Sequence, residues 1–206
     1  MPILTELFYL PPIEYFALIS GQGELCIDGT DRYQKQSYRN RARILLANKV
    51  DTLSIPVLRS SKKQFYKDVK IDYGQKWKNV HLRGIQSAYG KAPFYEYFFP
   101  YLEVVYAKNL TFLFDLNIEL LTVCLKLLQS DTKIQVVSET LDTNEYHDTR
   151  GIINTKEDFT SRNIMTAYLY DQMFGVNFVP NLSILDLLFC KGPESKDVLN
   201  LSKKND

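Results

Sequence analysis

Three arginines occupy alternate positions in the segment Tyr33-Gln-Lys-Gln-Ser-Tyr-Arg-Asn-Arg-Ala-Arg-Ile44. Five of residues 32–43 are basic and none is acidic. Guanidinium groups bind phosphate and carboxylate through paired hydrogen bonds. The amides of Gln36 and Asn40 add donors and acceptors that suit a ligand rich in hydroxyl groups. The segment therefore favours a binding surface for an anion or a polar small molecule.

The spacing of the arginines depends on where the following strand begins. In an extended chain, alternate side chains share one face, so Arg39, Arg41 and Arg43 would point the same way. Two interpretations stay open for them. They bind an anionic ligand, or they form internal salt bridges on the solvated face of a hairpin. We predict that Tyr33, Gln36, Arg39, Asn40 and Arg41 contact the substrate.

Asp186 extends this predicted site toward the other end of the chain. It is the acid within the apolar segment Ser183–Cys190, and a buried carboxylate needs a partner. An arginine of the motif is the expected partner. We therefore add Asp186 to the substrate-binding set, as the residue that orients an arginine.

His81 is the candidate catalytic residue, because imidazole titrates near neutral pH and can act as an acid or a base. It follows Trp77 by one turn on the apolar face of a predicted helix. The alternative is a hydrogen-bonded, half-buried histidine with a structural role. His147, in a polar stretch, is expected to be exposed.

Local signatures of common cofactor and metal sites are missing from the sequence. It contains no GxGxxG, GxxxxGK[ST], GxSxG, CxxC or HExxH motif. Its two histidines and three cysteines are too far apart to suggest metal-ligand spacing. We predict no cofactor and no metal. Reduced thiols in an odd number favour a cytoplasmic protein.

Charge and hydropathy narrow the partners. The net charge of the 206 residues is +1, which argues against nucleic acid as a partner. Residues 1–100 carry 15 basic and 9 acidic side chains, whereas residues 101–206 carry 10 and 15. The two halves are expected to attract each other or to offer a basic face to a ligand. No apolar run approaches about 18 residues, so no membrane span is predicted.

Hydrophobic periodicity predicts the elements that must position these residues. Strands are predicted at Ile3–Leu10, Glu24–Asp28, Val69–Tyr73 and Lys133–Ser138, with a hairpin between Arg41 and Val57. Helices are predicted at Ile13–Ile19, Gln75–Tyr89, Pro93–Lys108 with a kink or break at Pro100, Thr111–Gln129, Ile164–Met173 and Ser183–Cys190. The fold class is α+β, one domain over residues 1–206, in which an N-terminal β-rich part with the hairpin packs against a helical C-terminal part. Residues 139–158 form a long polar loop, which favours a lid.

Several segments, in order along nearly the whole chain, resemble the WbqC-like family, most closely its short members from Bacteroidetes. The matching segments are Tyr9-Leu-Pro-Pro-Ile-Glu-Tyr-Phe16, Tyr33–Arg41, Thr52-Leu-Ser-Ile-Pro-Val57, Trp77 with His81, Ser87-Ala-Tyr89, Ala92-Pro-Phe94, Pro180–Leu188 and Gly192-Pro193. The loop departs from the family pattern, because it contains Arg150-Gly-Ile-Ile-Asn-Thr-Lys156 where His-Pro is expected before the lysine. That departure argues against a catalytic role for the loop.

The resemblance implies a function in surface polysaccharide biosynthesis, since some family members resemble products of O-antigen and capsule gene clusters. It assigns no catalytic residues. The leading hypothesis is a cytosolic transferase that acts on an anionic, nucleotide-activated sugar precursor. The alternative is a non-catalytic binding or scaffold module of a polysaccharide assembly, with the aromatic segment Phe94–Tyr106 as its contact surface.

Overall fold

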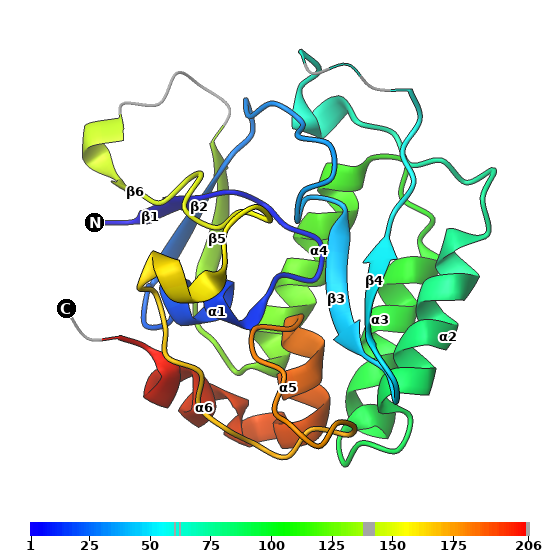
Figure 1. Ribbon diagram of the computed structural model, residues 1–206. Coiled ribbons are helices and arrows are strands. Elements are labelled where there is room, and N and C mark those ends of the chain that lie inside the picture. The colour runs from blue at the N-terminus through cyan, green and yellow to red at the C-terminus, as the bar shows by residue number, and fades with distance from the viewer. Residues whose placement is uncertain (60, 62, 138–142, 205–206) are drawn as a thin grey trace.

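The computed structural model describes residues 1–59, 61, 63–137 and 143–204. Four parallel strands form one sheet in the order β5-β2-β1-β6, and two antiparallel strands form a separate hairpin (Figure 1). The sheet consists of β1 (Ile3–Thr5), β2 (Glu24–Asp28), β5 (Lys133–Val137) and β6 (His147–Asp148), and the hairpin of β3 (Arg41–Leu45) and β4 (Val50–Ser54). The predicted hairpin and the α+β class are confirmed.

Six α-helices surround these strands in the described part of the chain. They are α1 (Ile13–Ile19), α2 (Trp77–Tyr89), α3 (Tyr95–Ala107), α4 (Leu113–Leu127), α5 (Ile184–Lys191) and α6 (Ser195–Ser202). Figure 1 shows α4 at the centre, between the sheet and the pair α2 and α3. Helix α2 contacts both hairpin strands, and α5 contacts β3. One cluster of buried side chains runs from Ile3 to Leu199, and the single domain over residues 1–206 stays a prediction.

The central helix α4 follows the predicted pattern. Leucines, Phe114, Cys124 and Asn117 are buried around most of its circumference, while Asp115, Thr122 and Lys126 remain exposed. Asn117 is held by its amide nitrogen, which donates to the backbone carbonyl of Arg39 over 2.7 Å and to the hydroxyl of Tyr66. This amide braces the arginine motif against the central helix.

Four predicted elements differ from the structure. The strand from Ile3 ends at Thr5, and the chain turns at Leu10, which has a positive φ of 41°. Helix α3 continues through Pro100, so the helix is not broken there, and a kink at this proline stays a prediction. In the segment Val69–Tyr73, isolated bridges replace the predicted strand.

Residues 164–173, predicted as a helix, form no helix. Tertiary hydrogen bonds explain the difference. The Tyr170 hydroxyl and the Gln172 amide both donate to Asp186, and Gln172 also bonds both backbone polar groups of Val179. These contacts hold the segment over α5, and they outweigh its helical periodicity.

Candidate functional site

The arginine motif divides where β3 begins. Residues 37–40 form a turn in which the backbone N–H of Asn40 donates to the backbone carbonyl of Ser37. Gln36, before this turn, has a left-handed φ of 59°. The strand therefore starts at Arg41, and the expected alternation holds only for Arg41 and Arg43. Ala42 and Ile44 point into the core between them. Arg39, before the strand, points elsewhere.

Arg39 is buried in an ionic cluster. Its side chain is 1% exposed, and the guanidinium bonds the carboxylates of Glu6, at 2.8 Å, and Asp31. Burial alone would lower the pKa of Arg39, but the two carboxylates outweigh it and raise the pKa above its ordinary value. The second Glu6 oxygen accepts the backbone N–H of Gly151. We call Glu6, Asp31 and Arg39 the ionic brace.

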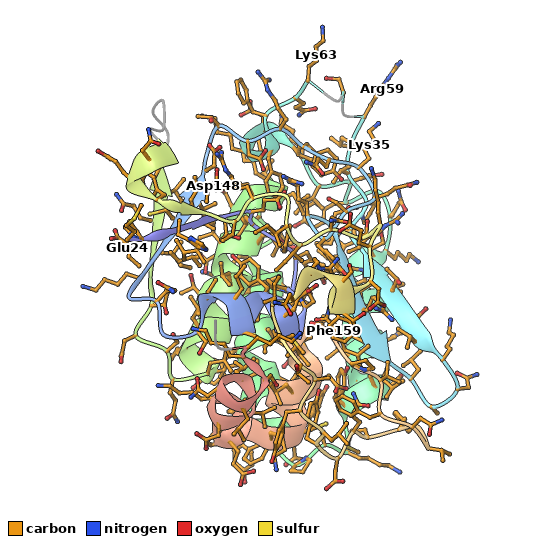
Figure 2. The ribbon with its side chains drawn as sticks, turned by 60° about the vertical axis from the view of Figure 1, so that its left-hand side comes forward. Glu24, Lys35, Arg59, Lys63, Asp148 and Phe159 are labelled. Carbon is orange, nitrogen blue, oxygen red and sulfur yellow. The ribbon has the colours of Figure 1, made fainter. Side chains whose placement is uncertain are left out.

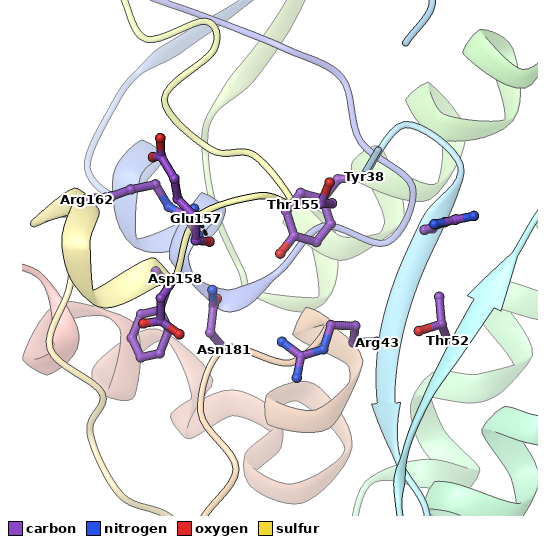
Figure 3. Close-up of a pocket in the computed structure, with 10 residues that line it drawn as sticks. Tyr38, Arg43, Thr52, Thr155, Glu157, Asp158, Arg162 and Asn181 are labelled. Carbon is purple, nitrogen blue, oxygen red and sulfur yellow. Dashed lines mark hydrogen bonds between the residues drawn. The ribbon is translucent and has the colours of Figure 1, made fainter. Parts of the chain in front are cut away.

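Arg41 and Arg43 instead line a cavity of about 320 Å³, the anion cavity (Figure 3). Neither guanidinium has an ion-pair or hydrogen-bond partner among the residues that the structure describes. Thr52 pairs with Arg43 across the hairpin and lines the same cavity. The remaining lining residues are Tyr38, Thr155, Glu157, Asp158, Phe159, Arg162 and Asn181.

A buried ion pair fixes the opposite wall of the anion cavity. Arg162 donates through Nε and one terminal nitrogen to both oxygens of Glu14, at 3.0 and 2.6 Å. Its other terminal nitrogen bonds the carbonyls of Asn154 and Glu157. Arg162 and Glu14 side chains are 3% and 0% exposed. Arg162 is thus neutralised, so it holds the loop in place and adds no free charge to the cavity.

Three polar groups reach the cavity beside the arginines. Asn181 accepts the Glu14 backbone N–H through Oδ1, which leaves its amide nitrogen without a described partner. One oxygen of Asp158 caps the following turn, and hydrogen bonds from Thr160 lower its pKa, with smaller contributions from Arg162 and Arg43. Burial raises the pKa of the Tyr38 hydroxyl above its ordinary value. Figure 3 shows Tyr38, Arg43, Asp158 and Asn181 around one space.

A family model for the WbqC-like protein family matches residues 8–169 and 152–198. The chain belongs to the WbqC-like protein family. No curated protein and no solved structure matches it.

A second cavity of about 260 Å³ adjoins the first in this WbqC-like chain. Both are lined by Tyr38 and Thr155, which form the boundary between them. At this boundary the Thr155 hydroxyl donates to the Gln36 carbonyl over 3.3 Å. The second cavity is lined further by Glu6, Phe8, Gln34, Lys35, Gln36, Ser37, Arg39, Gly151, Ile153, Asn154 and Lys156. We call it the amide cavity.

Three of the predicted substrate-binding residues line one of the two cavities. Arg41 lines the anion cavity, while Gln36 and Arg39 line the amide cavity. Tyr33 is buried against Tyr66. Asn40 is buried and donates through its side chain to the Ile55 carbonyl over 2.9 Å.

Asp186 lies apart from both cavities, and its expected arginine partner is replaced. It is fully buried and accepts hydrogen bonds from Tyr170, at 2.6 Å, and Gln172, at 2.8 Å. In the part of the chain that is described, no arginine pairs with it. Burial raises the pKa of Asp186, and hydrogen bonds from Tyr170, Gln172 and Tyr89 oppose the rise.

His81 is also held by structural bonds. Its Nδ1 accepts the Tyr9 hydroxyl at 2.7 Å, and Nε2 donates to the Ser54 carbonyl at 3.2 Å. Burial lowers the pKa of His81 to about 4, and the bond to Ser54 opposes this. His81 borders a different cavity, beside Trp77 and Ser54. Its acid–base role stays a prediction, and its occupied nitrogens favour bracing.

Sequence reasoning missed the residues that close the anion cavity. Asn181 lines this cavity, and Ser183 caps α5, with its hydroxyl 3.4 Å from the Leu185 backbone nitrogen. The polar loop that departs from the family pattern supplies Thr155 and Asp158, and the turn that follows it, Phe159–Arg162, supplies Arg162. One feature of the sequence indicated this wall of the cavity. Glu14 is an acid in the apolar helix Ile13–Ile19, and a buried carboxylate needs a basic partner from elsewhere in the chain.

The described residues contain no helix long and apolar enough to cross a membrane. Among them there is also no group of three or more His, Cys, Asp or Glu side chains arranged to hold a metal ion. The predicted absence of a membrane span agrees with the first finding.

Proposed function

We propose that this WbqC-like protein is a cytosolic transferase that binds a nucleotide-activated sugar in the anion cavity during surface polysaccharide biosynthesis. One observation carries the proposal: Arg41 and Arg43 project from one strand face into a cavity and have no described protein partner. Guanidinium groups in this position can bind a diphosphate through paired, charge-assisted hydrogen bonds.

Neighbouring groups support an anionic ligand with a polar body. The Tyr38 hydroxyl and the Asn181 amide supply two neutral donors beside Arg43. Arg162 is neutralised by Glu14, so the unpaired guanidinium groups of the cavity come from β3, and the carboxylates of Glu157 and Asp158 line the same cavity. The three cysteines are free and buried, which suits a reducing compartment.

The test is calorimetric titration of the protein with UDP-, GDP-, ADP-, CMP- and dTDP-sugars. We expect one class to bind and the Arg41→Ala and Arg43→Ala variants each to bind roughly ten- to a hundredfold more weakly, because a hydrogen bond to a charged group contributes about 1.5–3 kcal/mol. Arg83→Ala is the matched control, since Arg83 is exposed on α2 away from both cavities. No binding by any sugar, or unaffected arginine variants, would contradict the proposal.

The alternative, a non-catalytic scaffold, is favoured by the surface of α3. Tyr97 and Val104 are 70% and 62% exposed on this helix, whereas Tyr95 and Tyr106 are buried. Exposed aromatic and apolar side chains on one helix are typical of a contact surface. Tyr97→Ser with Val104→Ser would leave nucleotide-sugar binding unchanged and, under the scaffold hypothesis, abolish association with the assembly.

A further inference from the structure

We infer that one elongated ligand spans both cavities, with its diphosphate in the anion cavity and its sugar in the amide cavity. The inference rests on the proposed function and deepens it, because it assigns the sugar to named residues. Its starting point is the boundary between the cavities, where Tyr38 and Thr155 line both.

Size favours a shared ligand. Sites for small molecules typically occupy about 300–1,000 Å³. The anion cavity, at about 320 Å³, lies at the lower end of this range, and the amide cavity, at about 260 Å³, lies below it. A nucleotide sugar is an extended molecule that needs more room than either cavity offers alone.

The walls of the amide cavity suit hydroxyl groups. The side chains of Gln34 and Gln36 are exposed and have no hydrogen-bond partner among the described residues. Each carboxamide offers both donors and acceptors, as sugar hydroxyls require. Arg39 also lines this cavity, but Glu6 and Asp31 neutralise its charge. The other cations of the cavity, Lys35 and Lys156, are exposed point charges. The forked guanidinium groups of Arg41 and Arg43 match a diphosphate better than a lysine does, so we place the diphosphate in the anion cavity.

The backbone conformation at Gln36 positions the side-chain amides of this segment. Gln36 sits in the left-handed region, and its carbonyl accepts the Thr155 hydroxyl at the boundary. The contact fixes the motif against the loop, with Lys35 and Lys156 lining the cavity from opposite segments. Figure 2 labels Lys35, which lines the amide cavity, and Phe159, which lines the anion cavity.

A thermodynamic cycle tests the assignment. UDP-glucose, GDP-mannose and dTDP-glucose are each titrated into wild type and into a Gln34→Ala/Gln36→Gly variant. The affinity of each is compared with that of its free nucleoside diphosphate for the same protein. Glycine tolerates the positive φ at position 36. We expect wild type to bind the nucleotide sugar more tightly than the free nucleoside diphosphate. In the variant, the ratio of these two affinities should be at least fivefold smaller. Affinity for the free diphosphate should not change.

Controls separate the two proposals. Gln86→Ala removes an exposed amide from α2 and should leave every affinity unchanged, and Gln34→Ala alone serves if the double variant is unstable. If the sugars bind but the variant keeps the full sugar contribution, or if the sugar adds nothing, the spanning ligand is wrong and the proposed function stands. If neither the sugars nor the diphosphates bind, both proposals are wrong.

Discussion

Arg39 and Arg43 lie four residues apart in one motif but belong to different regions of the molecule. Arg39 is part of the ionic brace, buried between Glu6 and Asp31, whereas Arg43 faces a cavity without a described partner. The start of β3 at Arg41 separates them. The density of arginines therefore does not identify a binding site. Each arginine must be judged by the carboxylates that the fold brings to it.

The largest expected effect distinguishes the two regions by stability. Arg39→Ala leaves Glu6 charged and buried, and removing one partner of a buried pair costs about 3–5 kcal/mol. Arg43→Ala removes an exposed, unpaired side chain and should change the free energy of unfolding by less than about 0.5 kcal/mol. Urea unfolding at pH 7.5 measures both. Equal effects would show that Arg43 also braces the fold.

A smaller effect concerns His81, whose hydrogen bonds to Tyr9 and Ser54 favour a structural role. The folded protein keeps this imidazole neutral down to about pH 4, whereas the unfolded chain takes up a proton near its ordinary pKa of 6.5. Stability should therefore fall as the pH drops from 6.5 to 4, by up to about 3 kcal/mol from this residue.

His81→Gln keeps both hydrogen-bonding functions and cannot titrate. Between pH 7.5 and 4.5 it should lose less unfolding free energy than wild type, while the exposed His147→Gln, as control, behaves like wild type. If His81→Gln retains the full pH dependence, the imidazole is not held neutral in the fold.

The smallest effect is expected at Asp186. Its raised pKa means that the folded protein holds the proton more tightly than the unfolded chain does. Stability from this group is present below the ordinary value of 3.8 and falls as the pH rises through the raised pKa. The free energy of unfolding of Asp186→Asn should thus lie within about 1 kcal/mol of the wild-type value at pH 7. Relative to wild type, the stability of the variant should increase as the pH rises from 4. A ligand-facing aspartate would instead change affinity and leave stability alone.

Local patterns predicted much of the fold. The helix Ile13–Ile19 and the strand Glu24–Asp28 have the predicted bounds, and the helix predicted at Gln75–Tyr89 begins at Trp77. Residues 164–173 show the limit of such patterns. Their helical periodicity is real, but Tyr170 and Gln172 gain more from bonds to Asp186, some 15 residues away, and periodicity does not record such partners.

The walls of the anion cavity were only partly predictable from the sequence. The motif located one wall, because period-two spacing placed Arg41 and Arg43 together. The other wall depends on contacts over about 150 residues, such as Glu14 with Arg162. Sequence spacing alone could not reveal that the polar loop returns to the motif. For the same reason, the sequence could not show whether Arg39 pairs with carboxylates of the protein or with a ligand.

The most direct measurement is a calorimetric titration of Arg41→Ala/Arg43→Ala with the nucleotide sugar that wild type binds, beside its urea unfolding curve. Our account predicts a wild-type unfolding midpoint together with the loss of detectable binding. Retained binding in this folded variant would contradict the claim that Arg41 and Arg43 form the anion site.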